Sequence, residues 1–208
     1  MLDALLAFLP VAALLTITPG AGTAMVVRSA VRGGRRHALF TTTGNSVGVL
    51  AWGCFAAVGI AAIVATSAEA FTAVKIAGAV VLVAMGIQSL RGRHGLAAPD
   101  QDLGAPSPPS DRVALRDGLL TSIANPKLAV FFVALFPQFV PDGAPVLPAA
   151  LVMAGTIVAL DLVWYSTLAF LVARARRAFV EGPWQRRFER LTGAVLVGLG
   201  VRLALERR

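Results

Sequence analysis

One acidic residue, Asp161, lies deep inside a long apolar run of the sequence. If that run crosses a bilayer, an ionised carboxylate near its centre costs about 3 kcal/mol on the insertion scale, so the residue needs a reason to be there. An acid in this setting takes and releases a proton, or contacts the ammonium of a substrate. The alternative is an interhelical hydrogen bond that holds a helix bundle together. We favour the first role and take Asp161 as the candidate proton-coupling and substrate-binding residue.

Two proline motifs interrupt apolar runs, Thr18-Pro19-Gly20 and Asn125-Pro126-Lys127. Proline removes a helical hydrogen bond and clashes with the preceding turn, so each motif predicts a kinked or broken helix. Broken helices expose N–H groups that attract a carboxylate, and irregular backbone at membrane depth is tolerated only where it is buried in protein or lines a cavity. The alternative is a pair of ordinary kinks. Because the motifs occur in matching runs, we expect the residues of both to bind substrate.

Two further polar residues are candidates for the same site. Lys127 supplies a counter-charge to Asp161, or its flexible stem carries the ammonium to the cytoplasmic interface. Asn45 adds an amide near the start of the second apolar run, between Gly44 and Gly48. That glycine pair is more typical of close helix packing than of a ligand cradle. We include Asn45 and Lys127 in the predicted site.

Three aromatic residues are either interface anchors or pocket walls. They are Trp52, Trp164 and Tyr165. We include Trp164 in the predicted site. No zinc pattern, nucleophile elbow or phosphate-binding glycine loop is present in the sequence, so we expect no metal and no cofactor.

The elements that carry these residues are predicted to be membrane-spanning helices. Hydrophobic residues make up 57% and charged residues 14% of the 208, against about 45–50% and 25% in soluble domains. A spanning helix needs about 20 apolar residues, and we expect an all-α integral membrane protein with about six spans. The apolar runs cover residues 4–27, 38–68, 71–90, 118–140, 144–173 and 191–205. A protein with five spans and one re-entrant segment is the alternative.

Basic residues mark the expected cytoplasmic side. Lys and Arg concentrate in the first, third and fifth connections, residues 28–37, 91–117 and 174–190, and cytoplasmic loops carry such an excess. Both termini then lie outside a membrane that the chain crosses several times. Asp3, with no Lys or Arg before the first apolar run, favours a span there over a cleaved signal peptide. Topology explains the net charge of +8, so we expect no nucleic-acid partner.

The two halves of the chain are predicted to be inverted repeats of three spans each. Gly78-Ala79-Val80 in the third run matches Gly193-Ala194-Val195 in the sixth. A proline-rich stretch separates the halves and has the composition of a linker. We divide the chain into a first repeat at 1–96, a cytoplasmic linker at 97–112 and a second repeat at 113–208. Inverted repeats with an odd number of spans are typical of secondary transporters.

Along nearly its whole length the sequence resembles the LysE/RhtB family of bacterial amino-acid exporters. The most specific part of the resemblance is Ala124-Asn125-Pro126-Lys127, followed by Phe131-Phe132 and Phe136-Pro137-Gln138-Phe139. The other parts are Thr18-Pro19-Gly20, Gly33-Gly34-Arg35-Arg36 and the series Gly44, Gly48 and Trp52.

Two positions depart from the family pattern. Val49 stands where many members carry an acid, and Val81 stands where they often have tyrosine. If those side chains contact substrate, the usual specificity for lysine, threonine or homoserine does not carry over. The loss of one acid also makes Asp161 more important in a proton-coupled mechanism.

The resemblance implies a multi-pass protein of the bacterial inner membrane that exports amino acids or close derivatives, driven by the proton gradient. We therefore expect a secondary transporter, not an enzyme, that exports an amino acid or related small zwitterion by proton antiport. Its expected partners are that substrate, membrane lipid and further copies of itself in a homo-oligomer. The alternatives are an exporter of another small metabolite or ion, and a membrane assembly protein that transports nothing. A membrane thiol–disulfide enzyme would need two cysteines, and the sequence contains only Cys54.

Overall fold

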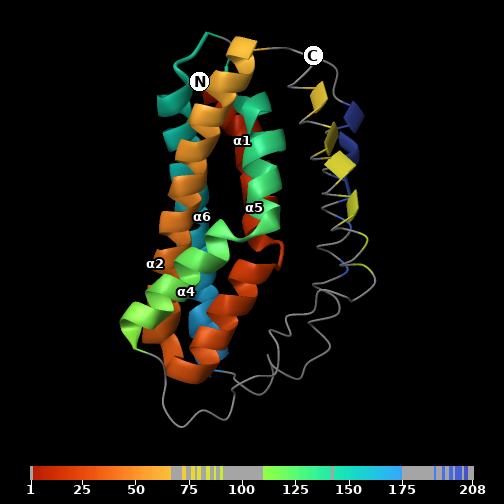
Figure 1. Ribbon diagram of the computed structural model, residues 1–208. Coiled ribbons are helices and arrows are strands. Elements are labelled where there is room, and N and C mark those ends of the chain that lie inside the picture. Colours follow the sequence, from red (N-terminus) through yellow and green to blue (C-terminus); the bar gives the residue numbers. More distant parts are fainter. Residues whose placement is uncertain are drawn as a thin grey trace.

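The computed structural model describes residues 2–66, 110–141 and 143–174, with scattered residues at 72–90 and 190–205. Every element in this part of the chain is a helix (Figure 1), which confirms the all-α prediction there. The elements are α1 (Leu2–Ile17), α2 (Ala21–Thr66), α4 (Asp111–Ile123), α5 (Pro126–Val130), the π-helix η1 (Phe131–Leu135), the 3-10 helix η2 (Phe136–Phe139) and α6 (Val146–Arg174).

Both proline motifs break a helix, as predicted. The axes of α1 and α2 differ by 49° across the first motif, and those of α4 and α5–η2 differ by 45° across the second. At the second break the side chain of Asn125 accepts a hydrogen bond from the Lys127 backbone N–H at 3.0 Å. Pro126 follows at the first helical position, where the N–H that proline lacks would have no intrahelical partner. The sequence around the break therefore both ends α4 and starts α5.

A sharp reversal inside α2 occurs at Gly34, which has φ 71° and ψ −169°. Glycine alone adopts this backbone conformation readily. The two arms on either side of Gly34 return along one another (Figure 1), and the hydroxyls of Ser29 and Thr41 lie 2.7 Å apart across them. The turn expected somewhere in 28–37 is therefore present, but it takes a single non-helical residue because both arms stay helical up to it.

Helices α2 and α4 pack with their backbones in contact at two glycines. A Cβ atom on Gly44 would collide with the Leu115 carbonyl oxygen, and one on Gly118 would collide with the Thr41 carbonyl oxygen. Small residues allow such close approach between helices in a membrane. The structure thus favours the packing role of Gly44 over a ligand cradle.

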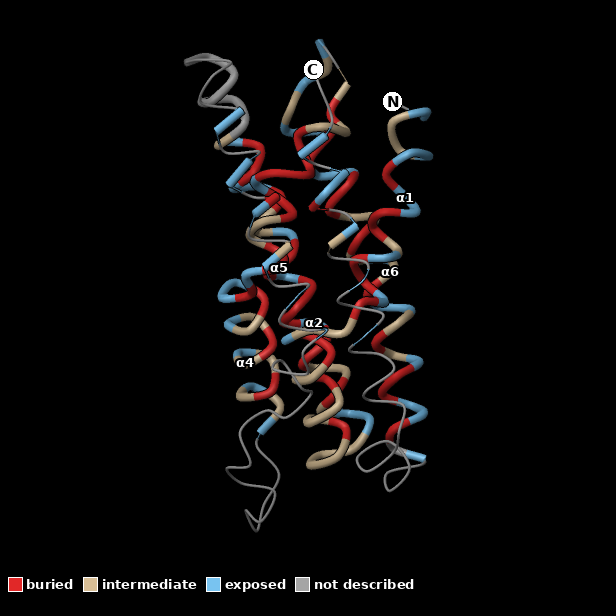
Figure 2. The backbone as a smooth tube through the Cα atoms, turned by 90° about the vertical axis from the view of Figure 1, so that its right-hand side faces the viewer, coloured by how far each residue is buried: buried red, intermediate tan, exposed pale blue. Residues whose placement is uncertain are grey.

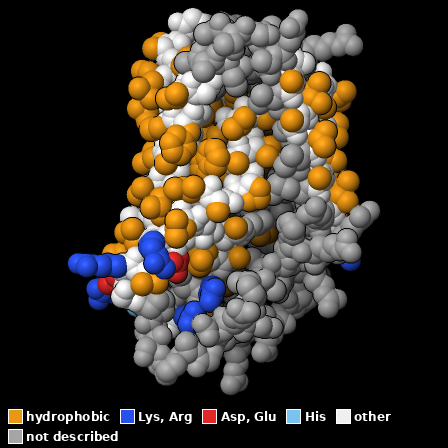
Figure 3. Space-filling model, viewed as in Figure 1, with side chains coloured by type: hydrophobic (Ala, Val, Ile, Leu, Met, Phe, Trp, Pro, Cys, Tyr) orange, Lys and Arg blue, Asp and Glu red, His pale blue; other side chains and the backbone are white. Residues whose placement is uncertain are grey.

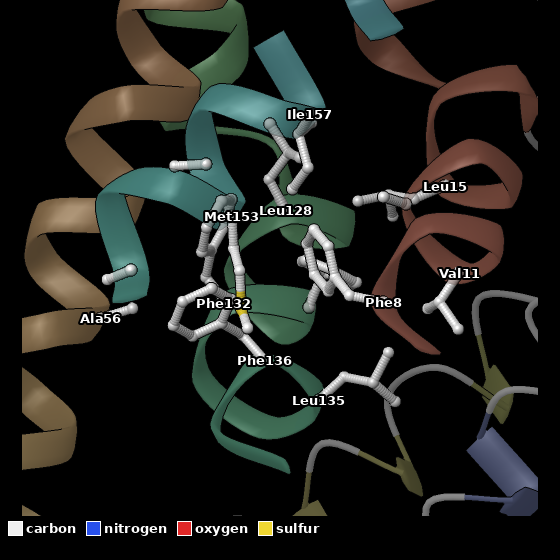
Figure 4. Packing of buried hydrophobic residues seen from close by; sticks show 14 of the residues in the cluster. Phe8, Val11, Leu15, Ala56, Leu128, Phe132, Leu135, Phe136, Met153 and Ile157 are labelled. Carbon is white, nitrogen blue, oxygen red and sulfur yellow. The ribbon is translucent and has the colours of Figure 1, made fainter. Parts of the chain in front are cut away.

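An aromatic core lies between α1, α6 and the short helices that follow the second break (Figure 4). Phe8 of α1 packs against Phe131 and Phe136, and the second of these contacts is edge-to-face with ring centroids 6.4 Å apart. Buried and exposed residues alternate along the helices (Figure 2), as expected when each helix presents one face to its neighbours and another to the surroundings. The core holds α1 against the second half of the chain.

The described residues on the face shown in Figure 3 are largely apolar, except at its lower end. Large hydrophobic residues such as Val58 and Val163 are 71% exposed, and hydrophobic side chains cover much of the face in Figure 3, with Lys and Arg gathered at its lower end. Arg35 lies over the ring of Phe170, 6.0 Å from its centroid, so the turn of α2 and the last turns of α6 lie at this same end. An apolar belt with a basic end fits a membrane protein.

By length and composition, the described residues contain up to three membrane spans. Val146–Val172 of α6 qualifies alone, and the bent pairs α1 with α2 and α4 with α5–η2 each qualify together. In the third and sixth predicted runs, a Cβ atom on Gly200 would lie 2.9 Å from the Ala79 carbonyl oxygen, so the described residues of these runs are in contact. Gly78, Gly193 and the linker at 97–109 lie outside the described residues. The count of six spans, the inverted repeat and the three-part division of the chain remain predictions.

Candidate functional site

Asp161 of α6 is held by side chains from two other helices. The Thr16 hydroxyl, near the end of α1, donates to Asp161 Oδ1 at 2.8 Å, and the Asn45 amide of α2 donates to Oδ2 at 3.1 Å. Both carboxylate oxygens therefore accept a hydrogen bond inside the helix bundle. Hydrogen bonds to a charged group contribute about 1.5–3 kcal/mol each, and they offset part of the cost of burying the carboxylate.

Lys127 of α5 holds the broken end of α1. Its Nζ donates to the carbonyl oxygens of Leu15 at 2.9 Å and Thr18 at 2.8 Å. Leu15 belongs to the last turn of α1 and Thr18 follows that helix directly, where intrahelical partners for the carbonyl groups run out. The second break thus supplies the cation that binds the free carbonyl groups of the first break. The ammonium of Lys127 is buried and does not reach the membrane interface.

A small cavity of about 10 Å³, with space for about one water molecule, lies between α1, α2, α5 and α6. Six polar residues line it, and each is at most 5% exposed. They are Thr16, Asn45, Asn125, Lys127, Asp161 and Tyr165. Its apolar wall, made of Leu15, Leu128 and Ile157, belongs to the hydrophobic core shown in Figure 4. Opposite charges share this cavity without a direct ion pair between Lys127 and Asp161 among the described contacts.

The first turn of α2 approaches the cavity at Gly22. A Cβ atom there would lie 3.0 Å from the Tyr165 hydroxyl oxygen and 3.1 Å from Asn45 Oδ1. The first backbone hydrogen bond of α2 runs from Ala24 to Gly20, so the preceding N–H groups have no partner within the helix. The hydroxyls of Thr23 and Tyr165 are neighbours, yet they do not meet hydrogen-bond geometry, and Thr23 Oγ1 is buried without a partner among the described residues.

The predicted site residues fall into three groups, and the first two lie at or beside the cavity. Asn45, Asn125, Lys127 and Asp161 converge on the cavity. The first proline motif contributes backbone: Thr18 offers its carbonyl to Lys127, a Cβ atom on Gly20 would lie 3.4 Å from Lys127 Nζ, and Pro19 separates the two helices.

Two predicted residues lie away from the cavity. Pro126 is exposed at the start of α5. Trp164 does not line the cavity but packs with Val27 and Val31 against a second hydrophobic cluster, to which Tyr165 also belongs. The buried indole N–H of Trp164 has no partner in the described ranges.

Two polar residues of the cavity, Thr16 and Tyr165, are absent from the predicted site. Tyr165 lies four residues after Asp161, which places both on one face of α6, so the helical period is a signal that finds it. Thr16 precedes the first proline motif by two residues, and only the packing of α1 against α6 brings it to Asp161.

A metal centre is not apparent in the described ranges. Nowhere in them do three or more His, Cys, Asp or Glu side chains gather in a way that would hold a metal ion. The polar residues of the cavity are suited to binding a small charged molecule through hydrogen bonds and opposite charges.

Comparisons with known proteins agree along nearly the whole chain. The family model described as LysE type translocator matches residues 13–207. The membrane protein YrhP of Bacillus subtilis is 27% identical over 209 residues, which cover 98% of this chain and 100% of its own. The homoserine/homoserine lactone efflux protein of Salmonella typhimurium is 31% identical, with 97% and 96% covered. The threonine efflux protein of Escherichia coli K12 is also 31% identical, with 92% of each chain covered.

No solved structure matches the chain significantly. The family model nevertheless spans both helix breaks, the cavity and the basic end. LysE type translocators are membrane transporters and not enzymes, and an efflux transporter implies a small-molecule substrate. This chain belongs to the LysE type translocator family.

Proposed function

We propose that this translocator exports an amino acid or a related small zwitterion from the cytoplasm by proton antiport. The observation that carries the proposal is the cavity itself, in which a buried carboxylate and a buried ammonium lie between two broken helices. Relatives named for threonine and homoserine efflux support the substrate class. Transporters commonly bind their substrates near the bilayer midplane at such discontinuous helices.

The substrate carboxylate is proposed to bind at the first turn of α2. Free N–H groups and the positive end of the helix dipole favour an anion there. Thr23 and Tyr165 add two hydroxyls beside the same turn. The N-terminus of α5 is less available to an anion, because the Asn125 side chain already accepts a hydrogen bond from the Lys127 backbone N–H.

The substrate ammonium is proposed to bind at Asp161. The amide of Asn45 connects the two subsites, since its Nδ2 donates to Asp161 while its Oδ1 lies near Gly22. The amide is short enough for one α-amino acid to span it, with the substrate carboxylate at Gly22 and the substrate ammonium at Asp161. An ammonium at Asp161 would take the place of the hydrogen bonds from Thr16 and Asn45.

Proton coupling follows from competition at one carboxylate. Asp161 binds the substrate ammonium when it is ionised, and it cannot do so while it holds a proton. A carrier that returns with the proton and leaves with the substrate exchanges the two across the membrane. The cavity of about 10 Å³ is far too small for an amino acid, so the helices around it must separate to admit substrate.

The substrate class is tested by counterflow in proteoliposomes loaded with a panel of amino acids, threonine and homoserine first, with and without a pH gradient. We expect at least one zwitterion to exchange and its release to accelerate when the outside is acidic. Failure of every zwitterion under all gradients would remove the exporter assignment.

The role of Asp161 is tested by Asp161→Asn. The amide keeps the size of the side chain but cannot ionise, so gradient-driven release should fall to the level of protein-free liposomes while the protein still folds and inserts. Asp117→Asn is the matched control, because Asp117 is partly exposed and pairs with Arg116 at 3.3 Å away from the cavity. Wild-type release by Asp161→Asn would reduce Asp161 to a packing residue.

A further inference from the structure

The ammonium of Lys127 binds two oxygen atoms from the other half of the chain. It donates to two backbone carbonyls of the first helix break, at 2.9 Å to Leu15 and 2.8 Å to Thr18. The residue is 5% exposed, and the Asp161 carboxylate lies across the cavity. The carbonyl and carboxylate oxygens favour a positive charge at Nζ, and they offset the cost of burying it.

The end of α1 has the properties of a site for a small cation. Carbonyl groups at the C-terminus of a helix carry the negative end of its dipole. Half-helix ends and unwound backbone carbonyls, often near an acidic side chain, are also the groups that bind coupling cations in secondary transporters. Here a side chain, and not a free ion, occupies that place.

The second helix break shows that a charge is not required merely to satisfy a broken end. At the end of α4, the carbonyl of Ser122 accepts a hydrogen bond from the neutral indole of Trp52 at 3.1 Å. A neutral donor therefore suffices at one break, whereas the other has an ammonium. The ammonium is found at the break that lies near Asp161, whose carboxylate accepts a hydrogen bond from Thr16 in the last turns of α1.

We propose that Lys127 is a tethered cation, the permanent occupant of a monovalent-cation site formed by the Leu15 and Thr18 carbonyls opposite Asp161. Stability and transport should then need no free sodium. Removing the side chain should leave a site that accepts a small cation from solution. The stability part of this inference stands apart from the proposed function, and only its transport part rests on that function.

The test uses purified full-length protein and its thermal unfolding in detergent. Lys127→Ala shortens the side chain and leaves space that ethylammonium can fill; Lys127→Met removes the charge but keeps the stem. We expect the Tm of Lys127→Ala to fall by at least about 5 °C, the size of shift expected on losing a buried charged group from a chain of this length. Ethylammonium should restore it saturably, sodium less completely and N-methylglucamine, which is too large, not at all.

Wild type and Lys127→Met should respond to none of these cations. If Lys127→Ala does not fold alone, purification in ethylammonium should recover it, and failure to recover any folded protein that way would overturn the proposal. Equal responses of all three proteins would also overturn it, because they would indicate a general salt effect. So would a sodium requirement for the stability of the wild type.

Efflux measurements separate this inference from the proposed function. In proteoliposomes, ethylammonium should restore zwitterion release by Lys127→Ala but not by Lys127→Met. A saturable rise in Tm with no zwitterion transported by the wild type would leave the tethered cation in place and remove the exporter assignment. A wild type that transports only in sodium would overturn the tethered cation and leave the exporter assignment in place.

Discussion

Tyr165 places a hydroxyl group beside the backbone of Gly22, at the proposed carboxylate subsite. Tyr165→Phe removes this oxygen and keeps the ring, so the fold should be unaffected. Losing one hydrogen bond of about 1 kcal/mol should raise the KM for efflux roughly fivefold to tenfold with little change in the maximal rate. Initial rates of release over a range of internal substrate concentrations measure both quantities.

Trp164→Phe is the matched control, because Trp164 precedes Tyr165 on α6 but does not line the cavity. Its KM should stay at the wild-type value. An unchanged KM in Tyr165→Phe together with a raised one in Trp164→Phe would contradict the geometry and restore the role expected for Trp164 from the sequence.

At the residue scale, the amino-acid sequence reveals side chains whose chemistry is unusual for their surroundings. Asp161 and Lys127 are charges within apolar runs, and Asn125 adjoins a proline, so each is conspicuous from the order of residues alone. Thr16 is an ordinary residue of an apolar helix, and its role depends on a contact with Asp161 that spans 145 positions. No local pattern encodes such a contact.

At the scale of the elements, α2 and α4 approach each other closely enough for their backbones to touch. Gly44→Ala or Gly118→Ala would press a methyl group into a carbonyl oxygen of the opposite helix. Overpacking of this kind costs about 1–3 kcal/mol, so each variant should lower the Tm of the purified protein. The two changes affect one interface, and their combined effect should differ from the sum of the single ones.

Gly155→Ala provides the control for helix propensity. It lies in α6, and a Cβ atom there meets no other atom within 4 Å. Alanine is the better helix former by about 1 kcal/mol, so the Tm should rise or stay unchanged. If Gly44→Ala behaved in the same way, α2 and α4 could not be as close as described.

Elements are predictable to the extent that their ends are local. Pro19 and Pro126 interrupt helices through their own covalent structure, and both breaks occur where the sequence predicts them. The π-helix at Phe131–Leu135 is different, because it lies in a segment whose phenylalanines pack against Phe8, far away in the chain. The turn at Gly34 is intermediate: glycine permits it, but nothing in the sequence limits it to a single residue.

At the scale of the whole molecule, the basic end should face the cytoplasm. In a Cys54→Ser background, Ser110→Cys places a thiol at the start of α4, at the end where Arg36 bonds to Asp111 at 2.7 Å. Positive charge is retained on the cytoplasmic side. A membrane-impermeant maleimide should therefore label this cysteine in inverted vesicles and not in intact cells.

Asp3→Cys tests the opposite end in the same background. Asp3 lies in the first turn of α1, at the other end of the bundle in Figure 1, and it should be labelled in intact cells. Labelling of Ser110→Cys from outside would reverse the predicted orientation and place the linker outside the cell. How the two halves pack against each other could not be predicted from the sequence, because it depends on contacts among several spans and not on the residues of any one span.

The bond between Lys127 and α1 has a consequence for biogenesis. Lys127 follows Leu15 by 112 residues, so α1 emerges from the ribosome and enters the bilayer long before its partner is synthesised. Until then the carbonyls at its broken end have no Lys127 to bind, and each unsatisfied backbone group in hydrocarbon costs several kcal/mol. Before Lys127 is synthesised, the broken end of α1 must therefore adopt a temporary state, in which its carbonyl groups bind water at the interface or contact the insertion machinery. Its final depth in the membrane is set only when the second half arrives.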